Sequence, residues 1–295
     1  MNCIKIYFRQ FFILLFLAVC FVNQGYSQTK DTIKKKKQPG FYVGVSIGPS
    51  QTNIKNTGTS SIANLVSNSQ SAFFGSIEAG YFFSKYLGLS SGIRYVSYKS
   101  QLTLNAYQNS YTTVDSEKDV FEMRVTGKGI TELQTVDLLS IPLCVNLKVP
   151  FSKKVGMYFK GGISISFPMN QKYTSTGTFT YKGFYPAYND LLENLPAYGF
   201  PTDKSVSQAG ELKLKTTGIS PIIFAGFDYA IQKKMQIAVG FSFISTSLGV
   251  KDGSTTTDKF QLSPDAEHVN SFSGGSSKIS ASSVGVEISF KYSLK

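Results

Sequence analysis

Apolar and polar residues alternate one by one along three segments of the chain. In residues 155–169 the apolar side chains fall mainly at odd positions, and glycine, serine and lysine fall at even positions. Residues 139–149 and 284–294 repeat the pattern. A period of two is that of a β-strand, whose successive side chains point to opposite faces. Each segment therefore predicts a strand with one apolar face and one small or polar face.

Five further segments are compatible with the same pattern, although less regular. They are residues 41–50, 71–83, 86–99, 217–231 and 235–249. Together with the first three they give eight predicted strands. Each is long enough to supply the roughly 9–11 residues that a tilted strand needs to cross a bilayer.

The connections between these strands alternate strictly between long and short. The short ones are residues 84–85, 150–154 and 232–234, and the long ones are about 51–70, 100–130, 170–216 and 250–276. This plan predicts an all-β fold, a closed antiparallel up-and-down transmembrane β-barrel of about eight strands with short periplasmic turns and long extracellular loops. Alternating stretches inside the long loops, at 179–183 and 211–215, are interpreted as strands that project beyond the membrane. Ten spanning strands are the alternative.

Composition decides which way the apolar face points. The chain is 42% hydrophobic and 14% aromatic but only 16% charged, which excludes a disordered protein, and its glycine and aromatic content argues against an all-helical one. A sheet with one face in water would carry more charge. We therefore expect the apolar face to contact lipid and the small, polar face to fill a narrow lumen.

Seven charged residues fall on the predicted inward face. They are Glu78, Arg94, Lys148, Lys160, Asp228, Glu287 and Lys291. A confined charge is costly unless it is paired, so four cations and three anions predict a salt-bridged interior network. The alternative is that some of them reach water at the strand ends and pair with nothing.

The first 39 residues differ from the rest. Residues 1–27 are typical of a signal peptide, with Lys5 and Arg9 before an apolar run of limited length and small residues before the expected cleavage point. A lipoprotein processed at Cys20 is the alternative. Residues 28–39 are interpreted as a basic periplasmic linker that could meet an anionic surface, and residues 40–295 as the barrel domain.

These features together resemble a known family. The resemblance rests on four features: the signal-like start, the glycine-rich opening 40–48, the Ile141-Pro142-Leu143 segment before a tight turn, and the amphipathic final strand 284–294. Over residues 40–295 the chain resembles Gram-negative outer-membrane β-barrel domain proteins of the porin-like and PorT-like kind. The resemblance implies an outer-membrane location and insertion by the barrel-assembly machinery, which recognises the last strand.

The sequence contains few residues that could form a catalytic or metal-binding site. His268 is the single histidine, and the nearby Asp265, Glu267 and Ser271 follow no recognisable catalytic or metal-ligand spacing. We therefore expect no enzyme activity, no cofactor and no metal site. The net charge of +12 is dispersed and no nucleic-acid-binding fold is indicated, so no nucleic-acid partner is expected.

Function is therefore expected in the outward loops. The longest loop, 170–216, is rich in aromatic residues suited to contacting a protein or a glycan: Tyr173, Tyr181, Phe184, Tyr185, Tyr188 and Tyr198. The alternative is that these rings pack together as a lid. The expected partners are outer-membrane lipid, including lipopolysaccharide phosphates, and an envelope protein or glycan. A small porin-like channel and a component of an envelope secretion assembly are the competing functions.

Overall fold

The computed structural model describes residues 40–57, 65–212, 214–215, 217–249, 271–272 and 278–294 of the 295-residue chain. All of them belong to one unit, Gln38–Lys295. The predicted signal peptide, the basic linker and His268 lie outside the described residues, so these interpretations remain predictions.

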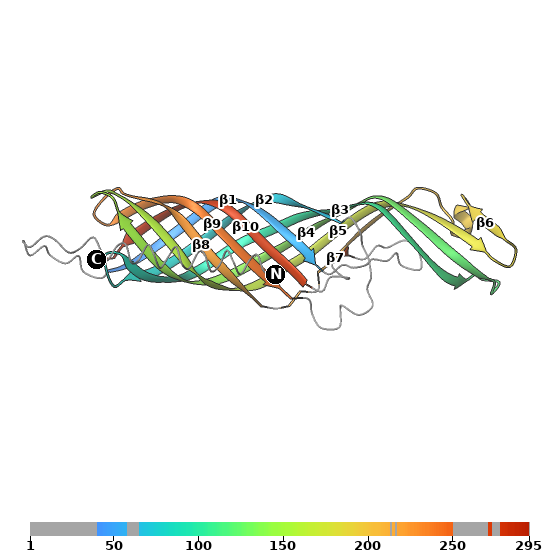
Figure 1. The fold of residues 1–295 in the computed structure, drawn as a ribbon, viewed down its shortest axis with the longest axis horizontal. Coiled ribbons are helices and arrows are strands. Elements are labelled where there is room, and N and C mark those ends of the chain that lie inside the picture. Colours follow the sequence, from blue (N-terminus) through green and yellow to red (C-terminus); the bar gives the residue numbers. More distant parts are fainter. Residues whose placement is uncertain are drawn as a thin grey trace, which may run out of the picture. The chain divides into compact units, whose positions relative to one another are not determined.

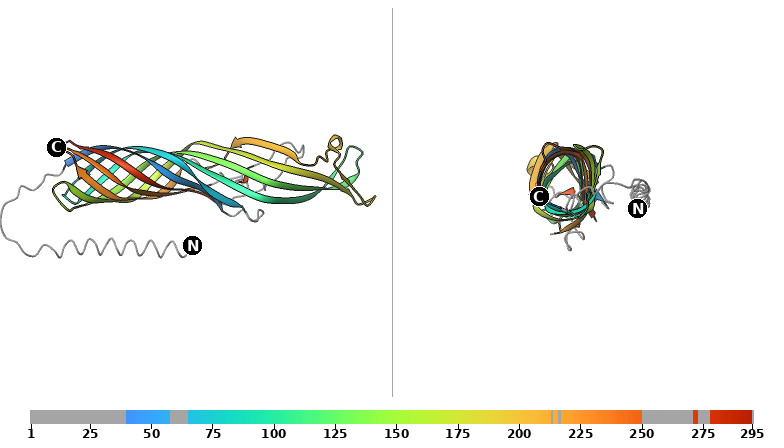
Figure 2. Two further views of the ribbon diagram at one scale, coloured as in Figure 1. Left: turned by 90° about the horizontal axis from the view of Figure 1, so that it is seen from above. Right: turned by 90° about the vertical axis from the view of Figure 1, so that its left-hand side faces the viewer.

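Eight antiparallel strands close into a ring. They are β1 (Gly40–Thr57), β2 (Val66–Phe82), β3 (Leu87–Val114), β4 (Val120–Pro150), β5 (Val155–Tyr185), β8 (Gly218–Ala230), β9 (Met235–Leu248) and β10 (Lys278–Ser293) (Figure 1). Hydrogen-bonded neighbours run from β1 through β2, β3, β4, β5, β8 and β9 to β10, and β10 pairs back with β1. The end-on view in Figure 2 shows this ring. The predicted closed, eight-stranded antiparallel barrel is confirmed.

Two short strands lie outside the ring. β6 (Asp190–Glu193) and β7 (Lys204–Glu211) both pair with β5, and within the described residues neither joins a second strand. They account for the alternative count of ten without adding a spanning pair. The helical content of the described residues is one short turn, η1 (Pro196–Tyr198), and no helix among those residues is long and apolar enough to cross a membrane.

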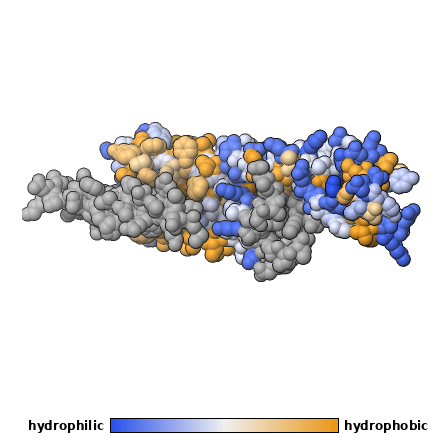
Figure 3. Space-filling view, turned by 45° about the vertical axis from the view of Figure 1, so that its right-hand side comes forward, coloured by the Kyte–Doolittle hydropathy of each residue, from blue (hydrophilic) through white to orange (hydrophobic). Residues whose placement is uncertain are grey.

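The apolar face of the ring points outward. Ile163 of β5 and Ile288 of β10 are 54% and 48% exposed, whereas the alternating neighbours Lys160 and Glu287 are buried. In the space-filling view of Figure 3 hydrophobic residues form a broad patch over the part of the barrel that lies toward the short turns. This is the orientation that the sequence predicts for a barrel in lipid, because a water-soluble barrel would turn the same residues inward.

Three strands run far beyond the lengths that the sequence predicts. β3, β4 and β5 have 28, 31 and 31 residues. Most of residues 100–130 and 170–185 therefore lie in strands. The sequence predicts loops there, with a projecting strand only at 179–183, which the structure shows as part of β5. These segments pair with one another out to the register partners Val114 and Val120, so their backbone groups stay hydrogen-bonded where the other strands have ended. We call this part of β3–β5, with β6 and β7, the extension.

The apolar side chains change from the outward to the inward face a few residues before the extension begins. Along β3, Leu89 and Ile93 point outward in the ring, but beyond Tyr95 the apolar residues Val96, Tyr98 and Leu102 point inward and are buried. Water surrounds a strand that has left the lipid, so its apolar side chains have to turn to the inside. The inversion marks the outer limit of the lipid-facing belt.

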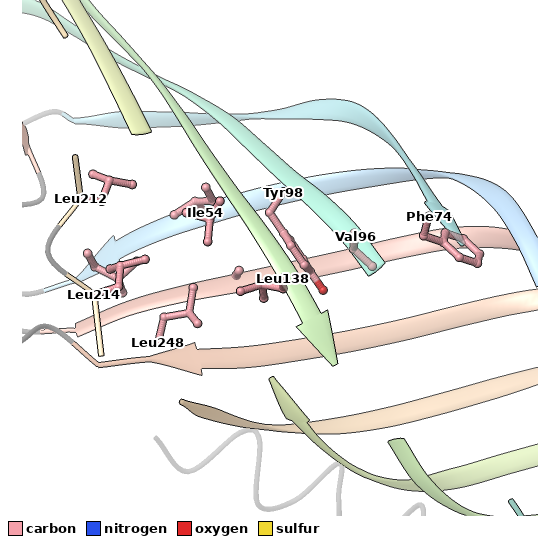
Figure 4. Packing of buried hydrophobic residues seen from close by; sticks show 11 residues of the cluster. Ile54, Phe74, Val96, Tyr98, Leu138, Leu212, Leu214 and Leu248 are labelled. Atoms are coloured by element: carbon pink, nitrogen blue, oxygen red, sulfur yellow. The ribbon is translucent and has the colours of Figure 1, made fainter. Parts of the chain in front are cut away.

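Apolar side chains fill much of the interior beyond the belt. One cluster closes the outer mouth of the ring with residues from many strands, among them Ile54, Val136, Leu138 and Leu248 (Figure 4). Leu212 and Leu214, which follow β7, are buried in the same cluster. A second cluster, around Phe179 and Phe272, forms the core of the extension.

Candidate functional site

The centre of the ring holds a connected set of ion pairs. Arg94 of β3 meets Glu287 of β10 at 3.3 Å between Nη1 and Oε2. Lys160 of β5 lies between two carboxylates, with its Nζ 2.7 Å from Glu78 Oε2 and 3.7 Å from Glu287 Oε1. Lys291 Nζ is 3.5 Å from the other oxygen of Glu78. Residues from four strands therefore meet inside the ring.

A separate pair lies nearer the short turns. Lys148 donates a hydrogen bond to Asp228 at 2.5 Å and another to the side-chain oxygen of Gln236 at 3.2 Å. With this pair, all seven charged residues that the sequence places on the inward face have an opposite charge within ion-pair distance. The two groups of ion pairs involve strands β2, β3, β4, β5, β8 and β10, so charged contacts reach most strands of the ring.

Aromatic rings fill the space around these charges. The guanidinium carbon of Arg94 lies 3.7 Å from the centre of the Phe74 ring, and the ammonium of Lys160 lies 4.7 Å from that of Phe224. Lys291 lies 4.6 Å from the Tyr158 ring. A cation above an aromatic face gains electrostatic stabilisation as well as packing. The cationic side chains are therefore held on two sides, by carboxylates and by rings.

The network leaves little room for water. Arg94 and Glu287 are each 1% exposed and Lys160 is 3% exposed, although they face the lumen. The cavity beside them, lined by Glu78, Arg94, Lys160 and Phe224 among others, has a volume of about 20 Å³, which suits roughly one water molecule. A lumen wide enough for solutes would expose these side chains, so the described interior is closed at this level.

A second polar centre, around Glu132 of β4, lies inside the extension. Its carboxylate is fully buried and accepts four hydrogen bonds: from Gln134 at 2.6 Å, from the Ser175 and Ser271 hydroxyls at 2.7 Å each, and from the Phe272 backbone N–H at 2.9 Å. Two of these donors belong to the connection between β9 and β10. Glu132 thus holds that connection inside the extension, where the Phe272 ring packs into the core.

The environment of Glu132 opposes its ionisation. Burial raises the pKa of this carboxyl above its ordinary value, and the hydrogen bonds from Ser175, Gln134, Phe272 and Ser271 offset the rise only in part. No cation pairs with it in the ion pairs of the described residues. Among the described residues, the carboxyl is therefore met by four hydrogen-bond donors and not by a cation.

The far end of the extension is a compact tip, which we define as residues 115–124 and 182–204. Tyr185 stacks on Phe121 with ring centres 5.0 Å apart, and its hydroxyl donates to Asp115 at 3.1 Å. Tyr188 donates to Asp119 at the same distance. Burial and the neighbouring Asp115 carboxylate raise the pKa of Tyr185. These contacts bind the end of the β3–β4 hairpin to the segment between β5 and β6.

The six aromatic candidates of the loop have different environments. Tyr181 is buried in the extension core and Tyr173 packs against the mouth cluster, so these two follow the alternative of internal packing. Phe184 is half-buried, 4.4 Å from the Arg124 guanidinium carbon. Tyr188 and Tyr198 are 66% and 75% exposed, which leaves them as the aromatic surface of the tip.

Sequence reasoning missed two features. Glu132 lies between the predicted loop 100–130 and the predicted strand 139–149, and its partners Ser271 and Phe272 are 139 and 140 residues away. Leu212 and Leu214 alternate with polar residues, which indicates a buried face but not what it packs against. The sequence signal that could have revealed a buried interior beyond the membrane is the change of the apolar residues from odd to even positions after Tyr95.

Comparisons with known proteins found a family model and several solved structures to which this chain is similar. A family model described as outer membrane protein beta-barrel domain matches residues 26–214. Among solved structures, the chain is similar to the outer membrane protein OprG of Pseudomonas aeruginosa, with 15% identity, 90% of this chain and 99% of that chain covered, and a TM-score of 0.40.

Two further solved structures are similar over most of the chain. Neisserial surface protein A has 12% identity, coverage of 86% and 98%, and a TM-score of 0.34. Ail of Yersinia pestis, in complex with the heparin analogue sucrose octasulfate, has 9% identity, coverage of 85% and 99%, and a TM-score of 0.25. No curated protein matches the chain.

Proposed function

This chain belongs to the outer membrane protein beta-barrel domain family and is a protein of the outer membrane, and from that premise we propose that it is a non-enzymatic, non-conducting barrel whose extension binds a protein or glycan at the cell surface. The observation that carries the proposal is the construction of the extension. Three ring strands continue unbroken into it, and it has its own apolar core. Such a scaffold holds a binding surface at a fixed place beyond the lipid.

The tip has the chemistry of a contact surface. Tyr188 and Tyr198 are exposed, with Leu191 and Leu195 partly exposed between them. Tyrosine offers a large apolar face and a hydroxyl, a combination that suits protein and sugar surfaces. The tip also carries seven carboxylates against four cations, namely Asp115, Glu117, Asp119, Glu122, Asp190, Glu193 and Asp203 against Lys118, Arg124, Lys182 and Lys204. This balance favours a neutral or basic partner over a sulfated one.

The closed interior supports the proposal over the channel alternative. Steady conduction would need the Arg94 and Lys160 layer and the apolar mouth cluster to open together. In planar bilayers we expect the purified protein to give no steady conductance, whereas replacing Arg94 and Lys160 with serine and Leu212 and Leu214 with glycine should produce one. Steady steps from the unaltered protein would favour the channel.

The binding role is tested at the tip. We expect immobilised protein to bind members of a panel of neutral oligosaccharides more tightly than heparin, and Y188S/Y198S to weaken that binding about tenfold, because each stacking tyrosine contributes roughly 0.5–1.5 kcal/mol. Y95S, which removes an exposed tyrosine of the lipid-facing belt, is the matched control. Tightest binding to heparin, or equal binding by both variants, would contradict the tip as the site. A role in an envelope assembly would appear as a protein that co-purifies with the unaltered chain but not with Y188S/Y198S.

A further inference from the structure

The three short turns at the opposite end of the barrel repeat one pattern. They read Phe-Ser-Lys-Tyr at 83–86, Phe-Ser-Lys-Lys at 151–154 and Ile-Gln-Lys-Lys at 231–234. Each begins with an apolar residue, continues with a small or amide side chain, and has lysine in third place. None contains an acidic residue. We call these three turns the short-turn rim.

The same backbone geometry places the side chains alike in each turn. The second residue donates its N–H to the carbonyl of the strand that follows: Ser84 to Leu87 at 3.2 Å, Ser152 to Val155 at 3.0 Å and Gln232 to Met235 at 3.2 Å. In the first two turns the serine hydroxyl also accepts a hydrogen bond from that strand. The repeated sequence is therefore a repeated structure.

Each turn is also fastened to the neighbouring hairpin. The carbonyls of Tyr86, Lys154 and Lys234 accept hydrogen bonds from Lys148, Ala230 and Ser293 at 2.7, 2.7 and 2.8 Å. These partners lie on β4, β8 and β10, so the bonds run from turn to turn around the ring. The positions of the turn lysines are thus set by the barrel.

The apolar first residues lie at the edge of the lipid-facing belt. Phe83, Phe151 and Ile231 are 46%, 59% and 47% exposed. They continue an outward aromatic border that includes Tyr229, Phe290 and Tyr292, the kind of girdle that lies at a membrane interface. The rim is therefore continuous with the surface that contacts lipid.

The lysines of the second and third turns are exposed, and no acid of the described residues pairs with them. Lys153, Lys154, Lys233 and Lys234 are all exposed, and none is within ion-pair distance of a carboxylate in the described part of the chain. Lys85 lies over the Tyr86 ring at 4.6 Å. Lysine side chains of this length reach from the belt edge to the headgroup level. The second and third turns thus combine an apolar anchor with two lysines each that pair with no carboxylate of the described residues.

We propose that the short-turn rim binds the phosphate headgroups of anionic phospholipids in the periplasmic leaflet of the outer membrane. The apolar residue of each turn enters the hydrocarbon edge, and the adjacent lysines meet phosphates. Basic residues close to an anionic lipid surface each gain an attraction that a zwitterionic surface does not supply. The rim would fix the depth of the barrel and gather anionic lipid around it.

Native mass spectrometry of the purified full chain in detergent, with equal amounts of phosphatidylglycerol and phosphatidylcholine, tests the proposal. We expect the unaltered protein to retain phosphatidylglycerol about fivefold more than phosphatidylcholine. The variant K153Q/K154Q/K233Q/K234Q should lose the preference, and the corresponding lysine-to-arginine variant should keep it. Heat-modifiable migration in gels checks that each variant is folded.

A matched control removes the same charge elsewhere. K118Q/K128Q/K182Q/K204Q neutralises four lysines of the extension and should leave the preference unchanged. The proposal fails if the rim variant keeps the preference, if the extension variant loses it equally, or if the unaltered protein shows none. Rim-dependent binding to isolated cell-wall sacculi without a lipid preference would also overturn it, because the occupant would then be the cell wall.

Discussion

Arg94 and Glu287 stand 193 residues apart in the sequence and meet across the lumen at 3.3 Å, each 1% exposed. Glu287 is also 3.7 Å from Lys160, so its loss leaves Arg94 without its carboxylate and Lys160 with Glu78 alone. Removing one partner of a buried pair costs about 3 kcal/mol. We expect E287Q to lower the unfolding free energy by about that amount.

R94M should be milder than E287Q, because Lys160 still faces Glu287 and the methionine can pack on Phe74. Urea unfolding in detergent micelles measures both. If R94M proves the more damaging variant, the pairing scheme inside the ring is wrong.

Barrel closure depends on the absence of a side chain at Gly48. A Cβ at this position would lie 1.8 Å from the carbonyl oxygen of Val286 on β10, the strand that closes the ring against β1. The contact is with backbone, which cannot move aside cheaply. We expect G48A to cost more than about 3 kcal/mol, beyond the usual cost of overpacking, and to reduce the heat-modifiable fraction sharply.

Gly75 is the control for this experiment. It lies in neighbouring β2, and a Cβ there would meet nothing within 4 Å. G75A should fold like the unaltered chain. Equal behaviour of the two variants would show that close approach at Gly48 does not limit closure.

The environment of Glu132 predicts how the unfolding free energy changes with pH. Burial raises the pKa of its carboxyl in the folded protein, whereas in the unfolded chain it titrates near 4.3. Between these two values the folded state binds more protons, so the unfolding free energy falls as the pH rises through this window. The variant E132Q cannot titrate and should lack this component.

The measurement is the difference between the unfolding free energies of the unaltered protein and E132Q, taken at several pH values. It should decrease from about pH 4.3 upward. A difference that is flat, or that increases with pH, would mean that the four hydrogen bonds outweigh burial.

The burial of Phe272 in the core of the extension predicts that the extension can be destabilised without destabilising the ring. Its fully buried ring packs into the core of the extension, which is distinct from the cluster around Phe224 inside the ring. Truncating a buried phenylalanine costs about 3–5 kcal/mol. In F272A, hydrogen exchange should accelerate at Ile130 and Phe179 and stay unchanged at Val286. Faster exchange at both places would indicate one cooperative unit.

The ring could be predicted from sequence because lipid imposes one simple rule on it. Most outward positions in the belt are apolar and many inward ones are small or polar, as residues 155–169 illustrate. That rule is local, so single segments reveal it. The same rule assigns Lys160 and Ile163 to opposite faces of their strand from their positions in the sequence alone.

The extension and its contacts could not be predicted in the same way. Beyond Tyr95 the surroundings change from lipid to water. The alternation continues there, but its apolar residues point inward instead of outward. The partners of Glu132 depend on how the connection after β9 returns to the barrel, which is a property of the whole chain. Likewise, alternation places Arg94 and Glu287 on inward faces but cannot say that they meet.

The continuity of β3, β4 and β5 from the short turns to the tip has a mechanical consequence. If a bound surface pulls on Tyr198, the force passes along the strand axes into the ring. The hydrogen bonds between β4 and β5 lie across that direction, so they are strained together in shear and do not open one after another. A tip held in this way resists being drawn out by flow better than a flexible loop of equal length, because extending it requires many hydrogen bonds to fail at once.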